Sequence, residues 1–455
     1  MARPDTPRPT DTLSLLQRLE IDAIARVWVV YHDYLGRAGG KIIPIESFAH
    51  AAEAGVVFAT ANLDFDHRDR QDPAARFLAS DGDFHAVPDP RSYGVLPQFP
   101  GTARVNAFMR TNTGAPWDGC PRTRLEEMVR TARETGFSFQ FGLEPEFYFV
   151  TRDEHGNRGP ADTTAMYSAA GLATQEPILR RILDLLRGMG VAVPQVGREY
   201  GHGQYELSTR HSDPVTAVDN YYAVREAVRD AATEFGVEAT FMPKPFTDWL
   251  GNSLHVHFSI WNAEGTTDLT PSDTDDTTLS PFGRHVVGGI LAHIDALTGL
   301  GSPSVNSYKR LQPGTWAPGN PYWGYNNRSG VIRIPGPASR RHIEYRASDN
   351  TAQAEMLLTG LIAAALHGIR DELDPGAPFD GDVGHMSPDE IAAAGLGELR
   401  GSSPAALDAL ERDEVIGEAL GETTLAHFLS LHRFEAAQYQ FQVHEWEREY
   451  YFEIC

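Results

Sequence analysis

The chain has 455 residues, of which 41% are hydrophobic, a composition typical of a globular protein with two unequal domains. It carries 62 acidic against 39 basic residues, a formal net charge of −23. Such a charge excludes nucleic acid and anionic membrane as favoured partners, because the electrostatic term is repulsive. Only two cysteines are present, Cys120 and Cys455, which excludes a disulfide framework and fits a cytoplasmic protein.

The first part of the chain predicts a small domain. Residues 1–10 are expected to be a disordered tail, and residues 11–115 are expected to form an α+β unit. The patterns predict helices at 12–19 and 47–54, strands at 26–31, 41–44 and 103–109, and a Gly-rich turn between the first two strands. A segment rich in Thr, Gly and Pro at 111–121 then predicts the boundary to a larger domain, residues 116–455.

The larger domain begins with a predicted helix at 122–135 and alternates helices with short strands. An apolar stretch at 357–369 is too short to span a membrane and predicts a buried helix. The chain from residue 424 onward is predicted to be helical and is rich in aromatic residues.

Four predicted strands of this domain share an unusual pattern, at 137–150, 203–207, 254–260 and 342–346. Each alternates apolar residues with acids or histidines, and side chains two positions apart share a face of a strand. The polar positions are Glu144, Glu146, Glu206, His255, His257 and Glu344. Wet faces of sheets usually carry lysine and threonine, whereas converging carboxylates repel one another unless a cation lies between them. Oxygen-rich sites with one imidazole suit Mg²⁺ or Mn²⁺, and an acid pair for glycoside hydrolysis is the other interpretation.

Arginines gather on a Pro/Gly-rich loop and the strands that follow it. The loop and strands carry Lys309, Arg310, Arg328, Arg333, Arg340, Arg341 and Arg346. Guanidinium groups bind carboxylate and phosphoryl oxygens in pairs, so acids for metals and arginines for anions together predict phosphoryl transfer. The sequence has no GxxxxGK[ST] motif, which excludes a P-loop as the ATP-binding device.

Seven short motifs resemble those of glutamine synthetases and follow that family's order. They are EPEF at 144–147, EYGHGQYE at 199–206, FMPKP at 241–245, HVHFS at 255–259, NSYKRL at 306–311, NNRSGVIRIP at 326–335 and RRHIEYR at 340–346. The resemblance covers the chain from about residue 26 onward. It implies a β-grasp N-terminal domain and a catalytic domain with a funnel of antiparallel strands. It also implies a homo-oligomer of stacked rings, usually a dodecamer, with each site shared between neighbouring subunits.

The same resemblance implies two metal ions, Mg²⁺ or Mn²⁺, and ATP as a substrate. The first ion would be held by Glu146, Glu199 and Glu206, and the second by Glu144, His255 and Glu344. Nucleotide contacts match His257, Ser259, Arg333 and Arg341. Glutamate contacts match Arg310, Arg346 and Gly251, next to the metal ligand His255. Arg328 matches the arginine that faces the transferring phosphoryl group, and Arg328 and Glu344 are the predicted catalytic residues.

The chain departs from the family at the ammonium site. Trp316 stands where the family has a glutamate, and Ala59 aligns with the aspartate that the N-terminal domain supplies. Asp81 is the one acid of that site predicted to remain. Loss of two acids and gain of an indole predict an organic amine, not ammonia, as acceptor.

The predicted activity is ATP-dependent ligation of glutamate to a primary amine through γ-glutamyl phosphate. An ammonia-using glutamine synthetase and a catalytically silent structural or sensor relative are the alternatives. Leu250, where the family commonly has asparagine, leaves the acid substrate open.

Overall fold

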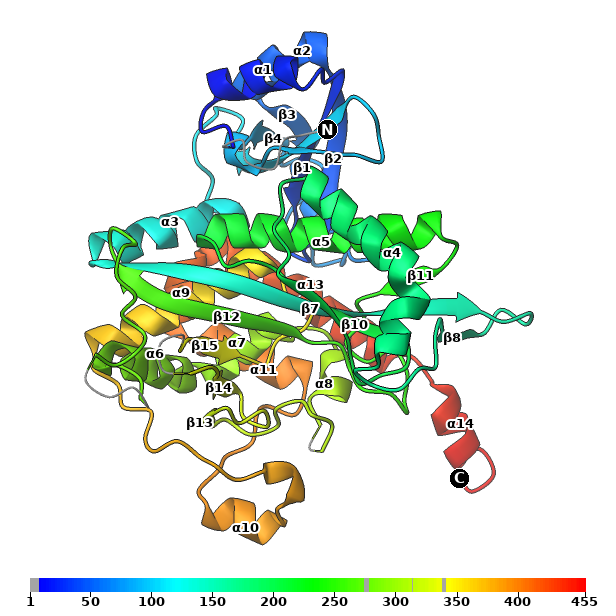
Figure 1. Ribbon diagram of the computed structural model, residues 1–455, viewed down its shortest axis with the longest axis vertical. Coiled ribbons are helices and arrows are strands. Elements are labelled where there is room, and N and C mark those ends of the chain that lie inside the picture. Colours follow the sequence, from blue (N-terminus) through cyan, green and yellow to red (C-terminus); the bar gives the residue numbers. More distant parts are fainter. Residues whose placement is uncertain (1–7, 274–277, 313, 338–340) are drawn as a thin grey trace.

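The computed structural model describes residues 8–273, 278–312, 314–337 and 341–455. The chain forms a small upper domain and a larger lower one (Figure 1). The first seven residues of the predicted tail and Arg340 of the arginine group lie outside the described residues.

The upper domain is a mixed sheet covered by two helices. Its strands are β1 (Arg26–His32), β2 (Ala38–Pro44), β3 (Val56–Ala59), β4 (Asp83–Pro88), β5 (Gly94–Val95) and β6 (Thr102–Arg110), in the order β2-β1-β6-β4-β3 with β5 beside β6. The helices are α1 (Thr12–Ile21) and α2 (Ile45–Ala54). β1 and β2 form the predicted hairpin, whereas β1 and β6 run parallel, a pairing of distant segments that local patterns do not reveal.

The lower domain is built on a nine-stranded sheet. Its path is β13-β14-β15-β12-β7-β10-β9, and β8 and β11 also pair with β7. The bounds are β7 (Phe137–Arg152), β8 (Arg158–Pro160), β9 (Gln195–Arg198), β10 (Gln204–Ser208), β11 (Glu238–Thr240), β12 (Leu254–Asn262), β13 (Trp323–Tyr325), β14 (Ile332–Ile334) and β15 (Ile343–Tyr345). The four strands predicted from alternation are β7, β10, β12 and β15, with ends shifted by one or two residues. Together with the helices, the two sheets confirm the α+β class.

The helices of the lower domain enclose this sheet. They are α3 (Pro121–Glu134), α4 (Ala169–Gly188), α5 (Pro214–Glu234), α6 (Pro281–Ala292), α7 (Ile294–Gly301), α8 (Ser307–Arg310), α9 (Ala354–Arg370), α10 (Pro388–Ala393), α11 (Ser403–Arg412), α12 (Glu414–Leu420), α13 (Glu422–Gln440) and α14 (Glu445–Tyr451). Helices α4 and α5 pack on β7 and β10 through an apolar cluster that includes Phe147, Phe149 and Tyr205. No described helix combines the length and apolarity needed to cross a membrane.

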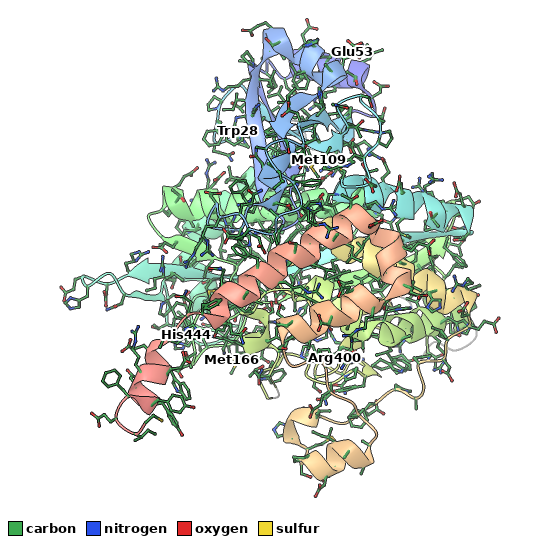
Figure 2. The ribbon with its side chains drawn as sticks, turned by 180° about the vertical axis from the view of Figure 1, so that it is seen from behind. Trp28, Glu53, Met109, Met166, Arg400 and His444 are labelled. Atoms are coloured by element: carbon green, nitrogen blue, oxygen red, sulfur yellow. The ribbon has the colours of Figure 1, made fainter. Side chains whose placement is uncertain are left out.

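The predicted buried helix is α9, whose first residues and apolar centre are buried between α3, α6 and α12. Its early leucines, Leu357, Leu358 and Leu361, have no exposed surface. From behind, α13 crosses the body towards His444, and α14 then projects away from the molecule (Figure 2). The C-terminal part of the chain is therefore helical, as predicted.

Candidate active site

The strand register brings the predicted acids and histidines opposite one another. Antiparallel pairing joins β7 to both β10 and β12, and β12 to β15. Three pairs result: Glu144 with His255, Glu146 with Glu206, and Glu344 with His257. Because directly opposite residues project to the same face of a sheet, the register itself gathers these groups.

These residues line a cavity of about 540 Å³ in the lower domain. Most of the site residues predicted from the sequence share it. They are Glu144, Glu146, Glu199, Glu206, Gly251, His255, His257, Arg310, Trp316, Arg328, Arg333, Glu344 and Arg346. Acids, arginines and one indole therefore face a common space.

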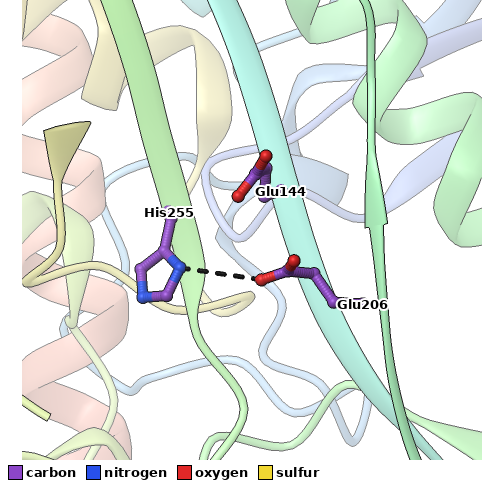
Figure 3. Close-up of side chains that lie close together, drawn as sticks. All are labelled: Glu144, Glu206 and His255. Carbon is purple, nitrogen blue, oxygen red and sulfur yellow. Dashed lines mark ion pairs between the residues drawn. The ribbon is translucent and has the colours of Figure 1, made fainter. Parts of the chain in front are cut away.

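The centre of the cavity is a compact group of metal-ligating atoms. Glu144, Glu206 and His255 each place a donor atom within 4.8 Å of the other two (Figure 3). Nδ1 of His255 lies 3.8 Å from carboxylate oxygens of both Glu206 and Glu344. This donor set, carboxylate oxygens and one imidazole, fits a hard divalent cation.

Burial without a cation is costly for several of these acids. Burial, followed by the charges of Glu144 and Glu146, raises the pKa of Glu206 above its ordinary value. Burial and the neighbouring Glu146 raise the pKa of Glu199 to about 7. Like charges that crowd a buried site favour proton or metal binding, so the electrostatics also fit a cation.

Two acids of the cavity are instead held ionised by cationic neighbours. Burial opposes ionisation of Glu144, but His257, whose Nε2 lies 3.0 Å from the Glu144 carboxylate, holds its pKa at about 2. Burial likewise opposes ionisation of Glu344, but Arg346 and the nearby histidines hold its pKa well below the ordinary value. Arg333 Nη1 donates to Glu344 at 2.7 Å, and Arg346 donates to the other carboxylate oxygen. Glu344 thus links the metal-ligating group to the arginines.

Arg310 lines the cavity and has one donor atom without a partner in the part of the chain that the structure describes. Its Nη2 donates to the carbonyl oxygen of Arg346 at 3.1 Å. Its Nη1 is buried and has no hydrogen-bond partner within the described part of the chain. A buried donor without a partner costs about 1–3 kcal/mol, so this nitrogen is suited to a carboxylate or phosphoryl oxygen of a ligand.

The predicted nucleotide contacts divide into two groups. His257 and Arg333 line the cavity, whereas Ser259 and Arg341 do not. The Ser259 hydroxyl accepts a hydrogen bond from Trp261 at 2.8 Å. The Arg341 guanidinium lies 4.8 Å from the centre of the Tyr325 ring, and its Nε and Nη1 have no partner among the described residues.

Trp316 stands at one end of the cavity in a group of aromatic side chains. Its ring stacks on Tyr200, with centroids 5.1 Å apart and planes at 29°. Tyr167 meets Tyr200 edge-on at 5.1 Å, and its hydroxyl donates to Glu199 at 3.3 Å. The two tyrosines were missed from the sequence: Tyr200 follows a predicted metal ligand directly, but nothing local marks Tyr167.

The predicted amine-site residues of the N-terminal domain lie elsewhere. Ala59 is exposed in β3, opposite Asp83 of β4. Asp81 is exposed in the turn before β4, where its carboxylate accepts from the Leu78 backbone at 2.6 Å. Neither lines the cavity of its own chain, so both belong to an amine site only if a neighbouring subunit contributes them.

Comparison with known proteins agrees with this geometry. The family model described as glutamine synthetase, catalytic domain, matches residues 118–451. A glutamate–methylamine ligase of Methyloversatilis universalis is 33% identical, with 98% of this chain and 99% of the relative covered. A glutamine synthetase of Halobacterium salinarum is 32% identical, with 97% of this chain and 96% of the relative covered.

A solved structure of a GmaS/ADP complex superposes with a TM-score of 0.86 at 31% identity, covering 98% of this chain and 100% of that one. This coverage extends over both domains of the chain. The chain therefore belongs to the glutamine synthetase family of ligases.

Proposed function

We propose that this protein joins glutamate to an organic primary amine, with conversion of ATP to ADP and phosphate. An oxygen of the glutamate side-chain carboxylate attacks the γ-phosphorus of ATP, and ADP leaves. The amine nitrogen then attacks the acyl carbon of γ-glutamyl phosphate, and phosphate leaves with the attacking oxygen. Of the two protons that the ammonium group loses, one ends on the phosphate and one in solvent.

The observation that carries the acceptor assignment is Trp316. Trp316 is 56% exposed and lines the same cavity as Glu199. An ammonium ion needs acids to hold it and take its proton, whereas an indole face attracts a cation and also contacts an alkyl group. The named glutamate–methylamine ligase among the relatives supports the same class of acceptor.

The arginines of the cavity suit the two anionic partners. Arg310, with its unmet nitrogen, and the adjacent Arg346 would bind the glutamate carboxylate, with the Gly251 backbone beside them. The exposed Arg328 guanidinium lines the same space and would spread the charge of the transferring phosphoryl group.

The acids of the cavity would hold Mg²⁺ or Mn²⁺. The ligands are divided as the resemblance implies, Glu146, Glu199 and Glu206 for one ion and Glu144, His255 and Glu344 for the other. When bound, these ions would neutralise the negative charge of the ATP phosphates. Glu199 also accepts a hydrogen bond from Tyr167 at the aromatic end of the cavity, which supports a role for this carboxylate in accepting the amine proton.

An ammonia-using glutamine synthetase is the second candidate. It is favoured by the many relatives that carry that name, including the one from Halobacterium salinarum. The two activities share every step except the nucleophile, so the acceptor alone separates them.

Isotope transfer tests the chemistry directly. Glutamate labelled with ¹⁸O in its side-chain carboxylate is incubated with ATP, Mg²⁺ and either methylamine or ammonia, and the phosphate released is analysed by mass spectrometry. We expect one ¹⁸O atom in each phosphate and a γ-glutamyl methylamide product. Phosphate without label would exclude an acyl phosphate, and labelled phosphate formed only with ammonia would replace the amine assignment by the second candidate.

A further inference from the structure

Tyr167, Tyr200 and Trp316 come from three separate segments of the chain and meet at one end of the cavity. Tyr200 stacks on Trp316 and receives the edge of Tyr167, with both pairs of centroids 5.1 Å apart. All three side chains line the cavity, and the Tyr167 hydroxyl donates to Glu199. The arrangement places ring surfaces beside a carboxylate.

Two of these aromatic residues adopt an unfavourable backbone conformation. Tyr167 has φ +53° and Trp316 has φ +59°, in a described chain where only six non-glycine residues have positive φ. Bulky side chains rarely occupy this left-handed region, and such strain persists where surrounding contacts over-determine the conformation. Both rings are 56% exposed, so burial of apolar surface does not account for their placement.

The chemistry of this end suits a cation with an alkyl group. Ring faces attract an ammonium ion and contact methyl or methylene groups, and the adjacent carboxylate of Glu199 favours positive charge. Glu199 and Glu206 line the same cavity, and their negative charges disfavour an acceptor that carries an acid group of its own.

A buried arginine fixes the two tyrosine-bearing segments relative to each other. Arg198 is 2% exposed, and its guanidinium donates to four backbone carbonyl oxygens. Three belong to the stretch from Glu199 to the first residue of β10, which carries Tyr200, and one belongs to the segment that leads to Tyr167. They are the carbonyls of Glu199 (2.6 Å), Gly201, Gln204 (3.1 Å) and Thr164 (2.9 Å).

We propose that Tyr167 and Tyr200 are specificity-determining residues that, with Trp316, bind a protonated primary alkylamine, and that Arg198 is the residue that positions them. This inference rests on the proposed function and names the acceptor class and the residues that select it. A lysine at position 198 has one ammonium group and cannot bridge carbonyls of both segments in the same way.

The test measures kcat/KM for methylamine and for ammonia in the full-length enzyme. We expect Tyr200→Ser to lower the methylamine-to-ammonia ratio by about 5-fold or more, because it removes the ring face and the apolar contact together. Tyr200→Phe keeps the ring and is expected to keep the ratio within about 2-fold of wild type. Phe235→Leu, an exposed aromatic at the end of α5 and outside the cavity, is the matched control.

Arg198→Lys separates positioning from general destabilisation. We expect its KM for methylamine to rise about 10-fold while its KM for glutamate stays within about 2-fold of wild type. The carbonyls that Arg198 holds belong to the segments of Glu199, Tyr200 and Tyr167, whereas Arg310 and Arg346, the proposed glutamate contacts, lie in α8 and after β15. Equal rises of both KM values would mean that Arg198 serves the fold alone and would overturn its positioning role.

The failure of this inference and that of the proposed function give different results. A wild-type enzyme that uses ammonia and no alkylamine removes the proposed function and this inference with it. A wild-type enzyme that uses methylamine, with an unchanged ratio in a cooperatively melting Tyr200→Ser variant, overturns this inference alone. If Tyr200→Ser does not melt cooperatively, Tyr167→Ser is measured against Tyr167→Phe with the same criteria.

Discussion

At the scale of single residues, the choice of acceptor is expected to depend on position 316. An indole offers a ring face and apolar surface, whereas a carboxylate offers a full charge to hold ammonium and a base to deprotonate it. Trp316 is half-exposed and stacks on one ring, Tyr200, so a smaller side chain can replace it without a buried cavity.

Trp316→Glu is expected to shift the enzyme towards ammonia. A carboxylate near the amine site is worth roughly 1–2 kcal/mol to a cation at partly screened distances, so kcat/KM for ammonia should rise about 10-fold and that for methylamine should fall. Glutamine has the length of glutamate without its charge, so Trp316→Gln should lower kcat/KM for methylamine and leave kcat/KM for ammonia unchanged. Steady-state phosphate release gives kcat/KM for wild type and both variants. An unchanged ratio of methylamine to ammonia use in Trp316→Glu would contradict the role of this residue.

Metal affinity is expected to depend on pH because of the buried acids. Burial and like charges raise the pKa of Glu199 to about 7 and also raise that of Glu206, and burial raises that of Glu146. Below pH 7 Glu199 holds a proton that a cation must displace, whereas above pH 7 Glu199 is already ionised. Affinity therefore falls as pH falls.

Calorimetric titration of the nucleotide-free protein with Mn²⁺ tests whether metal affinity falls as pH falls. We expect affinity to be about 10-fold or more weaker at pH 6 than at pH 8, with proton release on binding at pH 6. Glu206→Gln should weaken binding at both pH values. Equal affinity at pH 6 and pH 8 would show that the acids are not the ligands.

At the scale of secondary structure, the strands of the site were predictable because their pattern is local. Alternation within β7 and β12 marks which residues share a face, and it placed Glu144 and His255 correctly. The register between strands was not predictable from alternation, since it depends on pairing between segments more than 100 residues apart. The resemblance to glutamine synthetases implied which of these residues would share a metal ion, and the structure supplies the register.

The aromatic end of the cavity shows what the sequence does not reveal. Tyr167 lies in an irregular segment with no periodic pattern, and its role depends on a positive φ and on contacts with Glu199 and Tyr200. The four carbonyl contacts of Arg198 are equally invisible to side-chain patterns, because they are made to backbone atoms. The role of Tyr167 and the contacts of Arg198 therefore depend on tertiary placement and cannot be deduced from residue type.

At the scale of the whole molecule, the exposed surface suggests assembly. Helix α14 projects from the body, and the segment around it exposes large apolar side chains, including Phe441, Trp446 and Phe452. Exposed apolar surface of this extent commonly marks a protein interface. A homo-oligomer of stacked rings, as proposed from the family, would cover it and would bring a neighbour's Ala59 and Asp81 within reach of the cavity.

The central claim is that the acceptor is an organic amine, and a panel of nucleophiles tests it most directly. Phosphate release from ATP is measured with Mg²⁺ or Mn²⁺ and glutamate, in parallel reactions with ammonia, methylamine, ethanolamine, putrescine, spermidine, isopropylamine and aniline. The account predicts that a primary alkylamine supports a higher kcat/KM than ammonia, and that methylamine is among the amines that do. Turnover with ammonia equal to or better than that with every amine would contradict it.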